Sequence, residues 1–167
     1  LDSWGHLLSA APDELRELLR PAGLSNKRTE QFLGIARRLR QEFGEVSLDA
    51  LAEASTEEAE SFLCELPGVS QKVAKCVLMY GFDREVLPVD VHVFRLTRRL
   101  GWHSKSRADQ AHEQLEEIVP SNLRYGFHVN CVAHGRQKCA ARNPDCDECP
   151  LTEVCTFYQK EIESGAD

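Results

Sequence analysis

Four cysteines near the end of the chain have a spacing that suits metal binding. They follow the pattern C-x6-C-x2-C-x5-C and are Cys139, Cys146, Cys149 and Cys155. Four thiols this close together can form disulfides, hold a zinc ion or ligate an iron–sulfur cluster. The uneven gaps fit poorly with paired zinc knuckles, which use two short C-x2-4-C loops. The pattern therefore favours a [4Fe–4S] cluster, with zinc as the second interpretation and disulfides as the third.

A second segment with chemical potential is residues 66–72, with the sequence LPGVSQK. Gly68 can adopt a backbone conformation closed to other residues, and a helix expected to follow it would begin with free N–H groups. Such a turn between two helices can grip a phosphate through backbone amides without reading a base. Taken alone, the segment fits an ordinary turn between helices equally well.

The charge of the chain is unevenly distributed. The net charge is −7, which by itself argues against a nucleic-acid partner. Residues 66–108, however, carry eight Lys and Arg against three Asp and Glu, and Arg136, Lys138 and Arg142 form a second small basic group. A local basic stripe is what phosphate binding needs, whatever the global sign. A solvated charged face is the alternative.

The elements that must position these residues are helical. Pro12 opens a helix that residues 21–23 close, and Ser25 can cap a longer helix that ends at Gly44. Helical patterns continue over the short segments that begin at Ser47 and at residue 55 or 56, and over residues 72–80, 91–100, 107–119 and about 123–134. Only residues 86–91 could form a strand. We expect an all-α fold.

The sequence predicts one boundary between two helical parts of the chain. Residues 81–84 precede an extended segment, because the residue before Pro88 is pushed out of the helical conformation. With 167 residues and 42% hydrophobic content, the chain is long enough for one domain or two small ones. We expect two subdomains, residues 1–84 and residues 85–167.

Other sequence features indicate a reducing compartment. No apolar run approaches the roughly 20 residues that span a bilayer, and the first residues lack the pattern of a secretion signal. We expect an intracellular, reducing compartment, where thiolates stay available for metal. The remaining cysteines, Cys64, Cys76 and Cys131, fall in segments expected to be helical and are expected to be structural.

Taken in order, these motifs resemble the endonuclease III family of helix–hairpin–helix DNA glycosylases. The likeness runs from about residue 7 to residue 155 and rests on residues 66–72, residues 89–95 (VDVHVFR), residues 134–136 (HGR) and the four cysteines. The resemblance implies two helical subdomains flanking a cleft: a helical barrel in residues 1–84 with the hairpin, and an iron–sulfur subdomain in residues 85–167. It also implies a base excision repair N-glycosylase with AP lyase (β-elimination) activity on double-stranded DNA that contains abasic sites or damaged, in particular oxidised, pyrimidines. A protein of this kind is expected to be a monomer in the cytoplasm or nucleoid, or in the nucleus of a eukaryote.

In that family the lysine at the position of Lys72 is the nucleophile, and the aspartate at the position of Asp90 lies across the cleft. A lysine with the ordinary pKa of about 10.4 is almost entirely protonated at neutral pH, whereas attack on the sugar requires the free amine. Desolvation or a nearby base therefore raises its reactivity, and a carboxylate stabilises positive charge on the sugar. Without the resemblance, Lys72 would be a surface lysine and Asp90 a helix N-cap.

The resemblance also implies the DNA contacts. Leu24 is a candidate for the wedge that fills the gap left by an extruded base, with a buried loop leucine as the alternative. The hairpin residues Gly68, Val69 and Ser70 are expected to contact a phosphate through their backbone. Arg142 lies in the loop that resembles the family's phosphate-contacting cluster loop, and the cluster itself is expected to be architectural.

Several features depart from the family pattern. Ser70 replaces the second glycine usual in the hairpin, and residues 71–76 and 88–92 also resemble 8-oxoguanine glycosylases, which lack the cysteine cluster. Lys72 argues against the adenine glycosylase branch. About the first quarter of a typical member is absent before Leu1, as in a fragment, a cleaved product or a divergent member with reduced activity. The alternatives to a pyrimidine glycosylase are therefore an 8-oxoguanine glycosylase, a non-catalytic DNA-binding module and a zinc-stabilised interaction domain.

Overall fold

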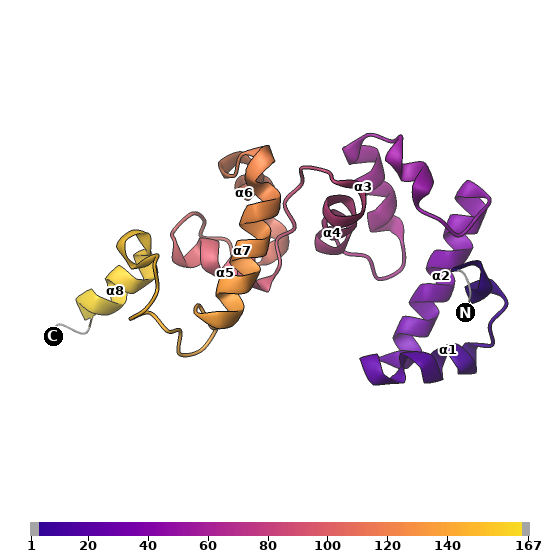
Figure 1. The fold of residues 1–167 in the computed structure, drawn as a ribbon, viewed down its shortest axis with the longest axis horizontal. Coiled ribbons are helices and arrows are strands. Elements are labelled where there is room, and N and C mark those ends of the chain that lie inside the picture. Colours follow the sequence, from indigo (N-terminus) through magenta and orange to yellow (C-terminus); the bar gives the residue numbers. More distant parts are fainter. Residues whose placement is uncertain (1–3, 165–167) are drawn as a thin grey trace. The chain divides into compact units, whose positions relative to one another are not determined.

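The computed structural model describes residues 4–164 of the chain, with side chains to residue 160. Every regular element in this range is a helix, so the prediction of an all-α fold is confirmed. Residues 83–90 form neither helix nor strand, so the possible strand over residues 86–91 is not observed. Short 3-10 helices fill several connections (Figure 1). The α-helices are α1 Pro12–Leu19, α2 Ser25–Phe43, α3 Thr56–Glu65, α4 Gln71–Phe82, α5 Val91–Arg99, α6 His112–Ile118, α7 Arg124–Gln137 and α8 Thr156–Ser164.

Local sequence explains most of the helix ends. Ser55 caps α3 in a capping box, since its side chain accepts from the Glu58 amide and the Glu58 side chain accepts from the Ser55 amide. Gly44 ends α2 with a φ of 78°, as predicted. Ser25, however, is the first residue of α2 and not its cap. The helix expected over residues 107–119 is also shorter than predicted, because a separate 3-10 turn precedes α6.

By their contacts, the residues fall into two compact units, residues 1–70 and residues 71–167. The sequence placed the division after residue 84, with α4 in the N-terminal part. In the structure α4 groups with the second unit, in which its Lys75 reaches α6. The subdomain boundary at 84/85 stays a prediction. None of the helices in residues 4–164 is both long and apolar enough to cross a membrane.

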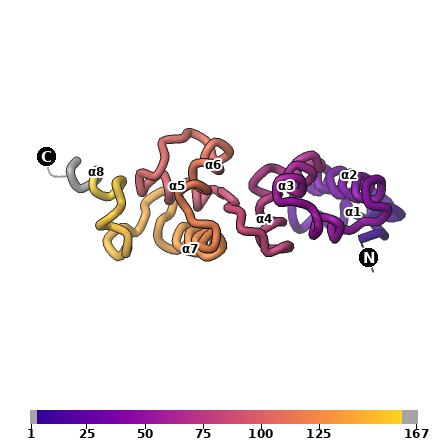
Figure 2. The backbone as a smooth tube through the Cα atoms, turned by 90° about the horizontal axis from the view of Figure 1, so that it is seen from above, coloured from indigo at the N-terminus to yellow at the C-terminus, as the bar shows by residue number. Residues whose placement is uncertain are grey.

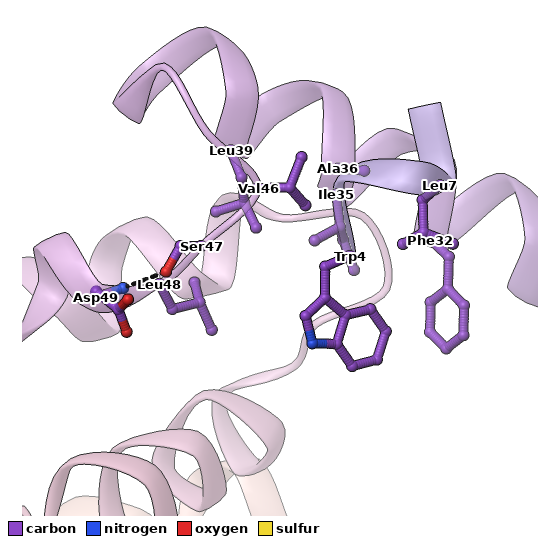
Figure 3. A pocket seen from close by; sticks show the side chains of 10 residues that line it. All are labelled: Trp4, Leu7, Phe32, Ile35, Ala36, Leu39, Val46, Ser47, Leu48 and Asp49. Atoms are coloured by element: carbon purple, nitrogen blue, oxygen red, sulfur yellow. Dashed lines mark hydrogen bonds between the residues drawn. The ribbon is translucent and has the colours of Figure 1, made fainter. Parts of the chain in front are cut away.

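The first unit is built around α1 and α2, which lie side by side (Figure 2). Its buried core includes Leu7, Leu15 and Leu33. A cavity of about 540 Å³ opens beside α2, and apolar side chains such as those of Trp4 and Phe32 line most of it (Figure 3). None of the residues predicted to carry chemistry lines this cavity, so the site lies elsewhere.

The second unit is built around an extended segment that is fully buried. Residues 86–89 are at most 5% exposed and pack with α5, α6 and α7. Because buried backbone polar groups need partners, side chains must satisfy this segment. The Leu87 amide donates to Glu116 Oε1 (2.7 Å), and the Pro88 carbonyl accepts from His128 Nδ1 (2.9 Å). The segment is therefore part of the packed core and not a flexible linker.

A buried ion pair fixes α4 to α6 in the same unit. Lys75 is only 3% exposed, and its Nζ lies 2.6 Å from Glu116 Oε1, the same oxygen that accepts from Leu87. One carboxylate thus serves both a buried ammonium and a buried amide. Such a group is costly to remove, because both of its partners stay behind in the core.

Replacement of Glu116 by alanine should destabilise the protein by about 3 kcal/mol, since the Lys75 charge and the Leu87 amide both lose a bond. The matched control is Glu117→Ala, one residue along the exposed side of α6, which should change stability by less than about 0.5 kcal/mol. Urea denaturation measures both. Equal stability of the two variants would show that the ion pair does not hold this core together.

Candidate active site and metal centre

The hairpin that precedes Lys72 depends on a glycine. Gly68 has a φ of 77°, and a Cβ atom there would lie 1.9 Å from the Gln31 side-chain nitrogen, so a larger residue does not fit without rearrangement. The Val69 amide donates to the Leu66 carbonyl (3.1 Å) and closes the turn. Ser70 is exposed directly before α4. Contact of these residues with DNA stays a prediction.

Lys72 is the second residue of α4 and is half-buried. It is therefore not the freely solvated lysine that its position on a helix would suggest without the family resemblance. Its place at the start of α4, directly after the hairpin, is where the family resemblance expects the nucleophile.

Asp90 is the N-cap of α5. Its Oδ1 accepts from the amides of His92 (2.9 Å) and Val93 (2.8 Å), which orients the carboxylate at the start of the helix. Among the described residues Oδ2 makes no hydrogen bond. The cap and a catalytic role are compatible, because one oxygen fixes the side chain while the other stays available.

One buried histidine lies within electrostatic reach of both candidates. Burial lowers the pKa of His128, while the Pro88 carbonyl and the Asp90 charge raise it and the Lys72 charge lowers it. The charges of Lys72 and Asp90 thus act in opposite directions on one histidine of the second unit. Because a carbonyl only accepts, the bond to Pro88 places a proton on His128 Nδ1.

Two exposed tyrosines beside this histidine were not found from the sequence. Tyr80 and Tyr125 are 54% and 56% exposed, their ring centroids lie 5.8 Å apart edge to face, and Tyr80 lies 6.0 Å from the His128 ring. Burial, and then the charges of Cys76, Tyr125 and Asp90, raise the pKa of Tyr80. Tyr80 could have been found from the sequence, because it lies eight residues after Lys72 on the same helix. No local pattern indicates Tyr125 or His128, because only the packing of α7 brings them beside Tyr80.

The four predicted metal ligands share one small cavity. All four cysteines line it, and all are partly buried. Burial, and then the charges of the other three thiols, raise the pKa of Cys146, as expected for sulfurs that face a common centre. None of the seven cysteines forms a disulfide, so the third interpretation of the motif is not supported.

The four thiols that line the cavity form a donor set that suits thiolate ligation. Cysteine thiolates are the ligands of iron–sulfur clusters, and they also bind zinc. The residues present therefore fit a cluster held by four cysteines. In the described part of the chain, no group of three His, Cys, Asp or Glu side chains is arranged to hold a single metal ion.

Leu24 and Arg142 lie in exposed loops. Leu24 is 73% exposed and has a φ of 52°, a conformation that is unusual for a leucine, so the alternative of a buried loop leucine is wrong. Arg142 is exposed between the first two cysteines. Both positions leave the side chains accessible, and their contacts with DNA stay predictions.

Comparisons with known proteins agree with this geometry. Residues 3–121 match the family described as HhH-GPD superfamily base excision DNA repair protein, and residues 139–155 match the iron–sulfur binding domain of endonuclease III. The chain is 34% identical to endonuclease III of Thermotoga maritima over 92% of its own length and 68% of that protein, and 30% identical to the Escherichia coli protein over 92% and 69%. The chain thus spans about two thirds of the length of these curated relatives.

Solved structures of endonuclease III with DNA have a fold similar to that of this chain. A non-covalent endonuclease III–DNA complex matches with a TM-score of 0.83 at 24% identity, covering 98% of this chain and 72% of that one. A trapped covalent intermediate of endonuclease III and DNA matches with a TM-score of 0.81 at 25% identity, covering 95% and 71%. Because the non-covalent complex is only 24% identical to this chain, its similarity concerns the fold alone.

The contribution of the Asp90 cap to stability can be measured by substitution. Asp90→Asn keeps an oxygen that can cap α5 and should leave stability within about 0.5 kcal/mol, whereas Asp90→Ala removes the cap and should cost about 1 kcal/mol. Chemical denaturation of the two variants measures the difference. If Asp90→Asn were as destabilising as Asp90→Ala, the carboxylate charge and not the cap would be the structural contribution.

Proposed function

The chain belongs to the endonuclease III family of the HhH-GPD superfamily of base excision DNA repair proteins, and from this premise we propose that it is a DNA glycosylase with AP lyase activity. Its proposed substrate is double-stranded DNA with a damaged base, oxidised pyrimidines first, or an abasic site. The observation that supports the proposal is the Asp90 carboxylate, which the amides of His92 and Val93 fix at the N-cap of α5, with one of its oxygens left available. A trapped covalent intermediate of endonuclease III and DNA among the similar structures supports covalent catalysis.

Lys72 and Asp90 divide the chemistry between them. The Asp90 carboxylate takes a proton from the Lys72 ammonium and stabilises the positive charge that develops on the sugar as the bond from C1′ to the base breaks. The free amine bonds to C1′ as the base leaves, and the base takes up the proton held by Asp90, which restores the carboxylate. A proton then passes from the lysine nitrogen to the ring oxygen, and ring opening gives a Schiff base. Loss of a C2′ proton then eliminates the 3′ phosphate, and water releases the lysine. His128 stays neutral, since burial lowers its pKa, and adds no competing cation.

Base extrusion and DNA binding fall to other residues. Leu24 fills the gap left by the extruded base, and the backbone amides of Gly68, Val69 and Ser70 hold a phosphate. Arg142 contacts a second phosphate from the cluster loop. Because DNA is the substrate, we place the protein inside the cell, where it acts as a monomer.

The chain contains an iron–sulfur binding domain, and we assign a [4Fe–4S] cluster to it. Cys139, Cys146, Cys149 and Cys155 hold the cluster in this assignment. When bound, it supplies a rigid cross-link that shapes the loop carrying Arg142. No catalytic step passes through it.

Borohydride trapping on abasic DNA tests the catalytic assignment. Lys72→Gln should abolish the covalent product, because an amide forms no Schiff base. Lys105→Gln is the matched control, since Lys105 is an exposed lysine of the same unit, and it should trap normally. Asp90→Asn should bind DNA at least as tightly but release the base roughly a hundredfold more slowly. Normal trapping by Lys72→Gln would refute an amine nucleophile at this position.

Metal content tests the cofactor assignment. The purified protein should carry about four iron atoms per chain and absorb broadly at about 400 nm. Cys149→Ser should lose this absorbance, whereas Cys64→Ser, which changes an exposed cysteine of the first unit, should keep it. One zinc ion per chain with no iron would support the zinc interpretation instead.

A further inference from the structure

A single arginine contacts the sulfur of the first cysteine and the loop that follows it. Arg99 is the last residue of α5 and is half-buried. Its Nη1 donates to Cys139 Sγ (2.9 Å) and to the Ala140 carbonyl (2.8 Å), and its Nη2 donates to the Ala141 carbonyl (3.3 Å). Arg142, the proposed phosphate contact, follows directly. The guanidinium therefore fixes a metal ligand and the backbone that leads to the DNA-facing residue.

The same residue also contacts the other end of the cysteine motif. The Arg99 carbonyl accepts from Thr156 Oγ1 (2.8 Å) and lies 3.6 Å from Cys155 Sγ. Its guanidinium lies over the Phe157 ring, 4.6 Å from the centroid. Arg99 thus joins the first and the last of the four cysteines through one side chain and one carbonyl.

Neighbouring cations do not share this contact. Arg95 donates to the Cys139 carbonyl (3.0 Å) and not to its sulfur, while Lys138 is paired with Asp145 and Glu148. Arg98 is exposed, and its side chain makes no hydrogen bond to the described residues. His134 Nε2 lies 3.6 Å from Cys149 Sγ, a longer contact from a ring that is not permanently charged. In the described part of the chain, Arg99 is the permanent cation that bonds to a cysteine sulfur.

A charged donor on a ligand sulfur affects the redox chemistry of a cluster. Reduction adds negative charge, which is spread over the iron atoms and their thiolates. A guanidinium that donates to a thiolate stabilises that charge, so it favours the reduced cluster and raises the reduction potential. An arginine keeps its charge at every physiological pH, so this effect is permanent.

We infer that Arg99 is a positioning residue of the iron–sulfur centre: it fixes the Cys139 thiolate, raises the reduction potential of the cluster and holds the loop that leads to Arg142. The inference rests on the proposed [4Fe–4S] assignment. It concerns a residue that neither ligates the cluster nor contacts the reacting sugar.

The test is a redox titration of the iron-loaded protein, with iron content measured first. Arg99→Gln should lower the equilibrium constant for one-electron reduction about tenfold, a shift of about 59 mV to lower potential. Arg98→Gln removes the same charge one residue away and should shift it much less. Arg99→Lys keeps the charge but loses the planar set of N–H donors of the guanidinium, so its reduction potential should lie between the wild-type and Arg99→Gln values.

Each outcome decides the inference. If Arg99→Gln loses iron while Arg98→Gln retains it, Arg99 is needed to position the Cys139 thiolate. The effect of Arg99 on the reduction potential is then measured with Arg99→Lys. If Arg99→Gln keeps its iron and has the same potential as Arg98→Gln, the inference is wrong while the cluster assignment stands. If the wild-type protein carries zinc instead of iron, the cofactor assignment fails and the inference with it, whereas Schiff-base trapping at Lys72 remains a separate result.

Discussion

The buried extended segment of residues 86–89 is the constraint on which the second unit depends. It pairs with no strand in the described residues, and side chains satisfy some of its backbone groups: Glu116 accepts from the Leu87 amide and His128 donates to the Pro88 carbonyl. Because Asp90 follows this segment directly, the same bonds that bury it also place the carboxylate. His128 belongs to this network and lies within reach of the Lys72 and Asp90 charges, so the proposed catalytic pair is built on the core and not on a mobile loop.

A short helix connects this core to the metal centre. Asp90 caps the first turn of α5, and Arg99 ends the helix nine residues later with its bond to the Cys139 sulfur. Arg95, between them, donates to the Cys139 and Gly135 carbonyls and so ties α5 to the cysteine loop and to α7. An architectural role for the cluster therefore has a physical basis: the loop that it shapes holds the helix whose N-cap is the proposed catalytic carboxylate.

The sequence predicted the helical fold and most helix ends, because prolines, capping residues and apolar spacing act locally. It could not predict the start of α6, where a 3-10 turn interrupts an otherwise helical pattern. Nor could it identify His128, Tyr125 or Arg99 as parts of the site. The roles of these residues depend on the packing of α7 on α5 and on the contact between the end of α5 and the cysteine loop. Both contacts join positions about 40 residues apart in the sequence. The order of motifs identified the family, while the supporting contacts required the structure.

The central claim is that the Lys72 amine is the nucleophile, and the most direct measurement locates the covalent bond itself. The protein is reacted with abasic DNA in the presence of borohydride, digested with protease and nuclease, and the modified peptide is sequenced by mass spectrometry. We expect the sugar remnant on Lys72 and an unmodified Lys75, since Lys75 is buried in its ion pair with Glu116. A remnant on Lys75, or on a lysine of the first unit, would contradict the account.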